Sequence, residues 1–91
     1  MSFRLLYTHS YNRKAAKFLR LHPDLLPQYE RTLKLLEIDP FHPSLRLHRL
    51  KGRLSELHSV SINISYRITL EFLIQERTII PANVGKHGEV Y

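Results

Sequence analysis

Basic and titratable side chains are concentrated in one short segment of this 91-residue sequence. Between positions 46 and 53, five of the eight residues are basic or titratable: Arg46, His48, Arg49, Lys51 and Arg53. Such a density suits contacts with phosphate groups, because each contact releases counterions and makes binding sensitive to salt. A solvated loop that is anchored to the core by its leucines is an equally good interpretation of this segment alone.

Histidine provides the second candidate chemistry, because imidazole titrates near neutrality and can give or take a proton. The six histidines do not have the spacing of a metal site, and the absence of cysteine excludes thiolate ligands and thiol nucleophiles. We therefore expect no metal and no cofactor. His58 shares a strand face with apolar residues, which favours packing over ligation. His87 follows a predicted strand near the end of the sequence, and by itself it is better explained by a hydrogen bond of the tail than by catalysis.

The charge balance indicates an acidic partner. Fourteen Lys and Arg stand against eight Asp and Glu, which gives a net charge of +6 and a pI near 10.0. A small domain this basic is expected to meet a nucleic acid, an anionic surface or an acidic protein. No apolar run is long enough for a membrane span or a signal peptide, so we expect no membrane association and a cytoplasmic location.

The positions of apolar residues predict a short strand over 3–7, two helices over 10–21 and 24–38, and three strands over 57–63, 66–74 and 78–85. One face of the first helix carries Tyr11, Ala15, Phe18 and Leu19, and one face of the second carries Leu26, Tyr29, Leu33 and Leu36. The first hairpin turn is expected at 63–65. Pro81 inside the last strand predicts an edge position or a bulge.

The order β-α-α-β-β-β predicts one α+β domain over residues 1–91, a small antiparallel sheet with a helical hairpin packed on one face. Inward positions are expected to be Val60, Ile62 and Ile64 on one strand, and Tyr66, Ile68, Leu70 and Phe72 on the next. The opposite face would then be open and polar, and it would carry Ser59, Ser61, Arg67, Thr69 and Glu71. We expect a binding surface there.

Four stretches in chain order resemble the RelE/ParE superfamily of toxin–antitoxin toxins, in particular its YafQ/YoeB-like (RelE/StbE) branch. They are His48-Arg49-Leu50-Lys51-Gly52, Ser59-Val60-Ser61-Ile62-Asn63, Tyr66-Arg67-Ile68 and Val84-Gly85-Lys86-His87-Gly88-Glu89-Val90-Tyr91. The resemblance covers the C-terminal half in motif detail and the whole chain in element order, and it implies a RelE-like fold.

The resemblance also implies an activity: ribosome-dependent mRNA endoribonuclease in the A site, neutralised by a small acidic antitoxin. The reaction is metal-free attack of a 2′-hydroxyl on the adjacent phosphate. The family's catalytic positions correspond to Arg67 as the phosphate-stabilising arginine, His87 as the C-terminal histidine and His48 as a proton-transfer group. The phosphate- or RNA-binding positions implied are Arg49, Lys51, Arg53, Lys86 and Tyr91.

Three other functions stay open at this point. ParE-type toxins of the same superfamily share the fold, bind DNA gyrase and cut no RNA. The titratable cluster around Arg67 favours the nuclease, because a gyrase inhibitor needs no such cluster. A plain nucleic-acid-binding module is supported only by net charge, and an inactive toxin that serves as a partner or repressor component is the third.

Overall fold

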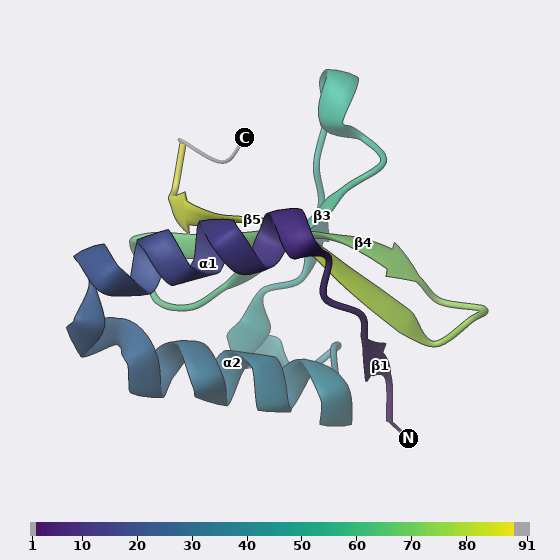
Figure 1. Cartoon of the computed structure of the whole chain (residues 1–91). Coiled ribbons are helices and arrows are strands. Elements are labelled where there is room, and N and C mark those ends of the chain that lie inside the picture. Colours follow the sequence, from purple (N-terminus) through teal and green to yellow (C-terminus); the bar gives the residue numbers. More distant parts are fainter. Residues whose placement is uncertain (1, 89–91) are drawn as a thin grey trace.

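The structure is a computed structural model, and it describes residues 2–88. Within that range, two helices pack on a five-stranded sheet (Figure 1). The α+β prediction is thereby confirmed. The elements are β1 (Arg4–Leu5), α1 (His9–Leu21), α2 (Leu26–Ile38), β2 (His48–Arg49), β3 (His58–Ser61), β4 (Tyr66–Leu73) and β5 (Thr78–Lys86), with short 3₁₀ turns η1 (Pro23–Leu25), η2 (Pro43–Leu45) and η3 (Gly52–Leu54).

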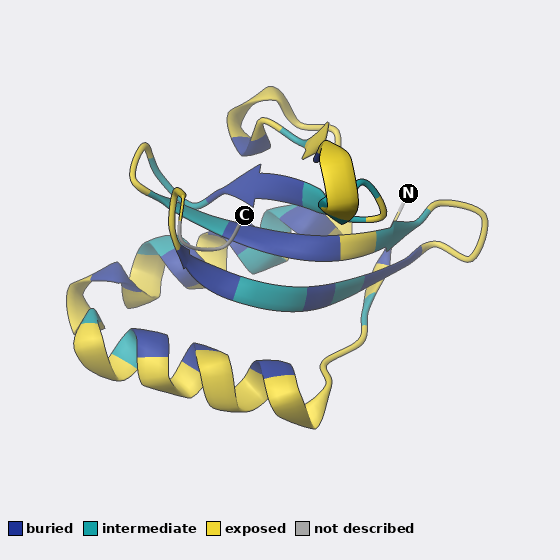
Figure 2. Ribbon diagram, turned by 90° about the horizontal axis from the view of Figure 1, so that it is seen from above, coloured by how far each residue is buried: buried dark blue, intermediate teal, exposed yellow. Residues whose placement is uncertain are grey.

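The first helix forms as its sequence predicts. Thr8 is its N-cap, and the Thr8 hydroxyl accepts a hydrogen bond of 3.0 Å from the backbone N–H of Tyr11. Tyr11, Ala15 and Phe18 are buried along one face, and the outer face is exposed and basic (Figure 2).

The start of the second helix differs from the prediction. Residues 23–25 form the 3₁₀ turn η1, and α2 begins only at Leu26. Because a 3₁₀ turn has three residues per turn rather than 3.6, the inward position falls one residue earlier. Leu25 is therefore buried, whereas Leu26, predicted to face the core, is 42% exposed.

The sheet is mixed and not wholly antiparallel, which corrects the prediction. The strand order is β1-β5-β4-β3-β2, and β1 runs parallel to β5, with Arg4 opposite Thr78 and Leu5 opposite Ile79. The first and last strands are therefore neighbours, and the two helices lie in the connection that follows β1. Strand β2 was not predicted, because its two residues are too few to show an alternating pattern.

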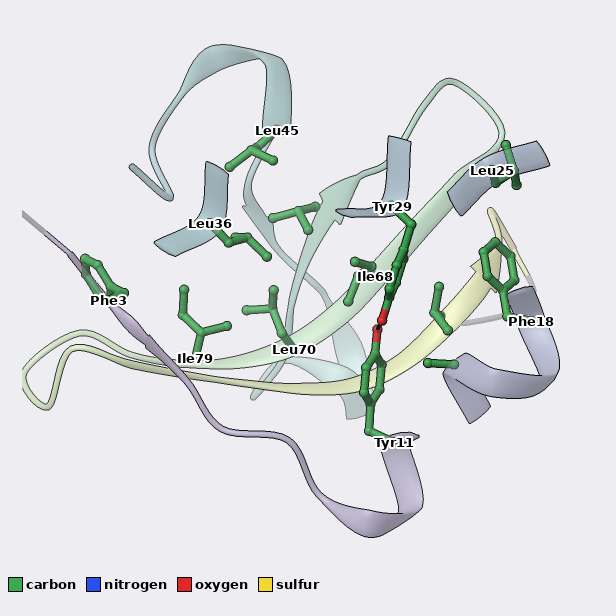
Figure 3. Packing of buried hydrophobic residues seen from close by; sticks show 13 residues of the cluster. Phe3, Tyr11, Phe18, Leu25, Tyr29, Leu36, Leu45, Ile68, Leu70 and Ile79 are labelled. Carbon is green, nitrogen blue, oxygen red and sulfur yellow. Dashed lines mark hydrogen bonds between the residues drawn. The ribbon is translucent and has the colours of Figure 1, made fainter. Parts of the chain in front are cut away.

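The core lies between the helices and one face of the sheet. In Figure 3, Ile68, Leu70 and Ile79 of the sheet lie among side chains from both helices. The hydroxyls of Tyr11 and Tyr29 meet at 2.8 Å in this core and join α1 to α2. Burial raises the pKa of both tyrosines, so both hydroxyls stay protonated and can share this bond.

The strand predictions hold except at their ends. The four inward positions of β4 are confirmed, since Tyr66, Ile68, Leu70 and Phe72 all belong to or pack on the core. Val60 of β3 and Ile62 just after it also do so, but the strand ends at Ser61, and Ile64 is 88% exposed in the turn that follows.

The bulge predicted at Pro81 is present. Thr69 pairs with Asn83 but Leu70 pairs with Pro81, so Ala82 is an extra residue on β5. The pairing of β1 with β5 stops at Ile79, so Pro81 lies beyond it. Proline, which has no backbone N–H, is tolerated at such a point because no regular hydrogen bond between strands is lost there.

Candidate catalytic site

The face of the sheet away from the helices brings Arg67 and His87 together. Arg67 lies on β4 opposite Gly85 of β5, and His87 follows two residues later, just after β5 ends. The Nε–H of Arg67 donates a hydrogen bond of 2.9 Å to Nδ1 of His87. Arg67 and His87 are 20 positions apart in the sequence, and both belong to the predicted site. The structure brings them into direct contact.

This contact determines the state of the imidazole. Arginine is a donor only, so Nδ1 of His87 must be the acceptor and carries no proton. The ring is then neutral with its proton on Nε2. The side chain of His87 is exposed, and in this tautomer the Nε2–H can donate a hydrogen bond to an oxygen atom of a bound molecule.

Arg67 has unused hydrogen-bonding capacity. Its side chain is half-buried, and Nη1 is buried without a hydrogen-bond partner, one of two such side-chain atoms in the described part of the chain. A buried guanidinium N–H that has no acceptor is unfavourable in a resting protein and is typical of a functional position. A phosphate oxygen is the acceptor that suits a guanidinium best.

The predicted open face is less open than the sequence suggests. Ser59, Ser61 and Thr69 face this side but are buried, with exposed fractions of 0%, 9% and 1%. These side chains are small, and the segment around η3 rises over the same face (Figures 1 and 2). The exposed groups on this face are therefore those at its margins, which include His87.

His48 shares this face, at some distance along the sheet from Arg67. It lies on β2 opposite Ser59, and Ser59 lies opposite Thr69 of β4. With strands about 4.8 Å apart and a rise of about 3.4 Å per residue, the α-carbons of His48 and Arg67 are about 12 Å apart. His48 is exposed, and its Nδ1 lies 3.0 Å from the carbonyl oxygen of Arg46.

The predicted phosphate-binding residues divide into two groups. Lys51 and Arg53 are exposed on the segment around η3, beside the polar face. Arg49 points its Nε–H to the carbonyl of Ser55, at 2.7 Å, and thereby closes that segment. Lys86 lies opposite Tyr66 and lines a groove of about 510 Å³ against α1, on the helical side of the sheet. Tyr91 lies outside the described residues.

His58 packs at the rim of the core, as expected. Its ring meets that of Phe72 edge-on with centroids 5.4 Å apart, and its Nδ1 is buried without a hydrogen-bond partner. Burial lowers the pKa of His58 from its ordinary value of 6.5, and the nearby Arg49 and His48 add to this effect.

We expect the folded protein to lose stability as the pH falls below about 6.5, in part through His58. The unfolded chain takes up this proton at the ordinary pKa, whereas the folded chain holds the pKa lower, so acid favours unfolding. Urea unfolding at about pH 7.5 and about pH 5 measures the loss. In His58→Phe the difference between the two pH values should be smaller, and an unchanged difference would assign the effect to other groups.

Neither a metal site nor a membrane span emerges from residues 2–88. No three His, Asp or Glu side chains in this range gather into a group that could hold a metal ion. Neither of its α-helices is long and apolar enough to cross a membrane.

Comparison with known proteins gives a clear result for the fold. No protein-family model and no curated protein matches the sequence. Among solved structures, the chain is similar to YafQ from E. coli strain BL21(DE3), with a TM-score of 0.78, 9% identity and 98% of each chain covered. It is similar to the E. coli DinJ–YafQ toxin–antitoxin complex, with a TM-score of 0.76, 11% identity, and 100% and 99% of the two chains covered.

A third similar structure is the YoeB/ParE toxin from Agrobacterium tumefaciens, with a TM-score of 0.74, 15% identity, and 93% of this chain and 99% of that one covered. Identities this low establish the fold, and the agreement extends over nearly the whole length of each structure. The fold that the sequence resemblance implies, that of the YafQ and YoeB/ParE toxin structures, is thereby confirmed.

Proposed function

We propose that this chain is the toxin of a type II toxin–antitoxin system and that it cleaves mRNA in the A site of the ribosome. The hydrogen bond between Arg67 and His87 carries the proposal, because it joins a phosphate-binding cation to a proton-transfer group on one polar face. Cleavage of RNA without a metal needs both kinds of group.

The proposed reaction is an internal transfer of the phosphate. The 2′-oxygen attacks the adjacent phosphorus and loses its proton to a base, while the bond from phosphorus to the 5′-oxygen breaks. The products are a 2′,3′-cyclic phosphate and a 5′-hydroxyl. Arg67 stabilises the charge that gathers on the phosphate oxygens, and His87 acts as the acid from its doubly protonated form, which loses one proton to the 5′-oxygen and becomes neutral.

His48 is the candidate for the second proton-transfer group. Its α-carbon is about 12 Å from that of Arg67, which one phosphodiester and two long side chains can bridge. The residues between them, Ser59 and Ser61, are small and buried, so the RNA would lie along the exposed margins of this face. Lys51 and Arg53, beside this face, would contact neighbouring phosphates and make binding sensitive to salt.

The proposed partner is an acidic antitoxin in the cytoplasm. A net charge of +6 on 91 residues favours a partner of opposite charge, because complementary charge speeds association and selects the partner. Similar structures include a toxin–antitoxin complex, that of DinJ with YafQ.

Primer extension on an mRNA in a reconstituted translation reaction tests this function. We expect discrete cuts inside codons, and fragments whose 5′ ends accept phosphate from a kinase. A metal-activated water would instead leave a 5′-phosphate and a 3′-hydroxyl, so the end groups distinguish the two chemistries. An mRNA with a 2′-deoxynucleotide on the 5′ side of the cut should resist cleavage there.

Intact mRNA would contradict the nuclease. The YoeB/ParE toxin among the similar structures makes DNA gyrase the next target to examine. Inhibition of gyrase-catalysed supercoiling by this protein, with intact mRNA, would establish a ParE-type inhibitor on the same fold.

A further inference from the structure

The turn between β3 and β4 is bonded to one member of the candidate pair and directly precedes the strand that carries the other. Residues 62–65 form this turn, and Arg67 lies two residues after it. The backbone N–H of His87 donates a hydrogen bond of 2.8 Å to the carbonyl of Ser65. The position of His87 relative to Arg67 therefore depends on the shape of the turn as well as on the strand ladder.

One side chain, that of Asn63, holds the turn in shape. Its Oδ1 accepts hydrogen bonds from two successive backbone N–H groups, 2.8 Å from Ser65 and 3.0 Å from Tyr66. Asparagine commonly stabilises turns in this way. Ser65 is the residue whose carbonyl anchors His87, and Tyr66 directly precedes Arg67. A single amide oxygen thus fixes the backbone beside each of the two candidate catalytic residues.

Asn63 is itself anchored to the helical layer. Its Nδ2 donates a hydrogen bond of 3.0 Å to Oε1 of Gln28 on α2, and its carbonyl accepts one of 2.6 Å from the hydroxyl of Ser61. The Gln28 backbone carbonyl in turn accepts the hydroxyl of Thr32. The turn is therefore tied to a rigid element on the far side of the sheet, which limits its movement.

We infer that Asn63 is a positioning residue that holds His87 and Arg67 in hydrogen-bonding register. Its catalytic consequence rests on the proposed function, but its structural consequence does not. Loss of the Oδ1 acceptor releases the N–H groups of Ser65 and Tyr66, and the anchor of His87 moves with them. Misplacement of a reacting group by about 1 Å can cost about 100-fold in rate.

The tautomer of His87 tests this inference without RNA. Two-bond ¹H–¹⁵N spectra should show a single tautomer in the native protein, with the proton on Nε2, and a mixture of both in Asn63→Ala. In Asn63→Asp the oxygen acceptor is kept, and rotation of the Gln28 amide can restore the remaining bond. This conservative variant should therefore return the native tautomer.

Single-turnover cleavage gives the second measurement. Asn63→Ala should cut about 10- to 100-fold more slowly with unchanged RNA affinity, and Asn63→Asp should be close to native. Thr78→Val is the matched control: it loses the hydrogen bond from the Thr78 hydroxyl to the carbonyl of Glu76, at the opposite end of β4 from the turn, and should keep both the tautomer and the rate.

The outcomes separate this inference from the proposed function. A native tautomer and a native rate in Asn63→Ala would overturn the inference. A disturbed tautomer in Asn63→Ala, with no cleavage by the native protein, would overturn the nuclease and leave the positioning role standing. Should Asn63→Ala fail to fold, Gln28→Ala removes only the anchor on α2, and a native tautomer and rate in that variant would refute the anchoring.

Discussion

Replacement of His87 by alanine is expected to slow mRNA cleavage by about 10²- to 10⁴-fold, the range that one general acid or base contributes. The variant loses the group that gives a proton to the 5′-oxygen, and Arg67 loses its hydrogen-bond acceptor. Because the side chain is exposed, its removal should change the free energy of unfolding little. Single-turnover rates in a translation reaction measure the effect.

His9→Ala is the control for the loss of a histidine. His9 is also exposed, but it lies at the start of α1, away from the polar face. The control should retain the native rate and the native sites of cleavage. Equal rates for the two variants and the native protein would remove His87 from the chemistry and reduce it to a surface residue.

Arg67→Ala is expected to lower the cleavage rate by about 10²- to 10³-fold, the loss that follows removal of one donor to a charged transition state. Stability should change little although the side chain is half-buried, because Nη1 has no acceptor to lose and Nε donates to an exposed ring. The rate and the urea midpoint together measure the two effects.

Arg67→Lys separates charge from geometry. Lysine keeps the positive charge but cannot hold a planar fork against both a phosphate and the ring of His87. We expect Arg67→Lys to bind RNA better than Arg67→Ala does, but to cleave it at a rate still well below that of the native protein. Arg20→Ala, on the exposed face of α1, controls for the loss of one positive charge.

If Arg67→Ala failed to fold, Arg67 would be a structural residue and not a catalytic one.

Elements with a clear period could be predicted from the sequence, and elements fixed by distant pairing could not. The helices and the three longer strands follow from apolar spacing. The two residues of β2 form a strand only because β3 lies beside them, and the direction of β1 depends on where the helical hairpin returns the chain. Both features depend on contacts between segments that are far apart in the sequence.

The candidate site could likewise be predicted only in part from the sequence. Side-chain alternation places Arg67 on the polar face, and the resemblance adds His87, but their contact depends on the turn at 62–65. Asn63 belongs to one of the four stretches that carry the resemblance, but its role is not evident from the sequence. An asparagine between two predicted strands is a turn signal, yet its bond to Gln28, 35 positions away, is visible only in the folded chain.

The parallel pairing of β1 with β5 has a consequence for biosynthesis. Arg4 and Leu5 are synthesised 74 residues before their partners Thr78 and Ile79. The sheet therefore cannot close until Thr78 and Ile79 have been made, and pairing between such distant segments is intrinsically slow. A chain interrupted before residue 78 would lack β5 and His87 together. Until residues 78–87 have been made, the nascent chain therefore cannot assemble the candidate site of Arg67 and His87.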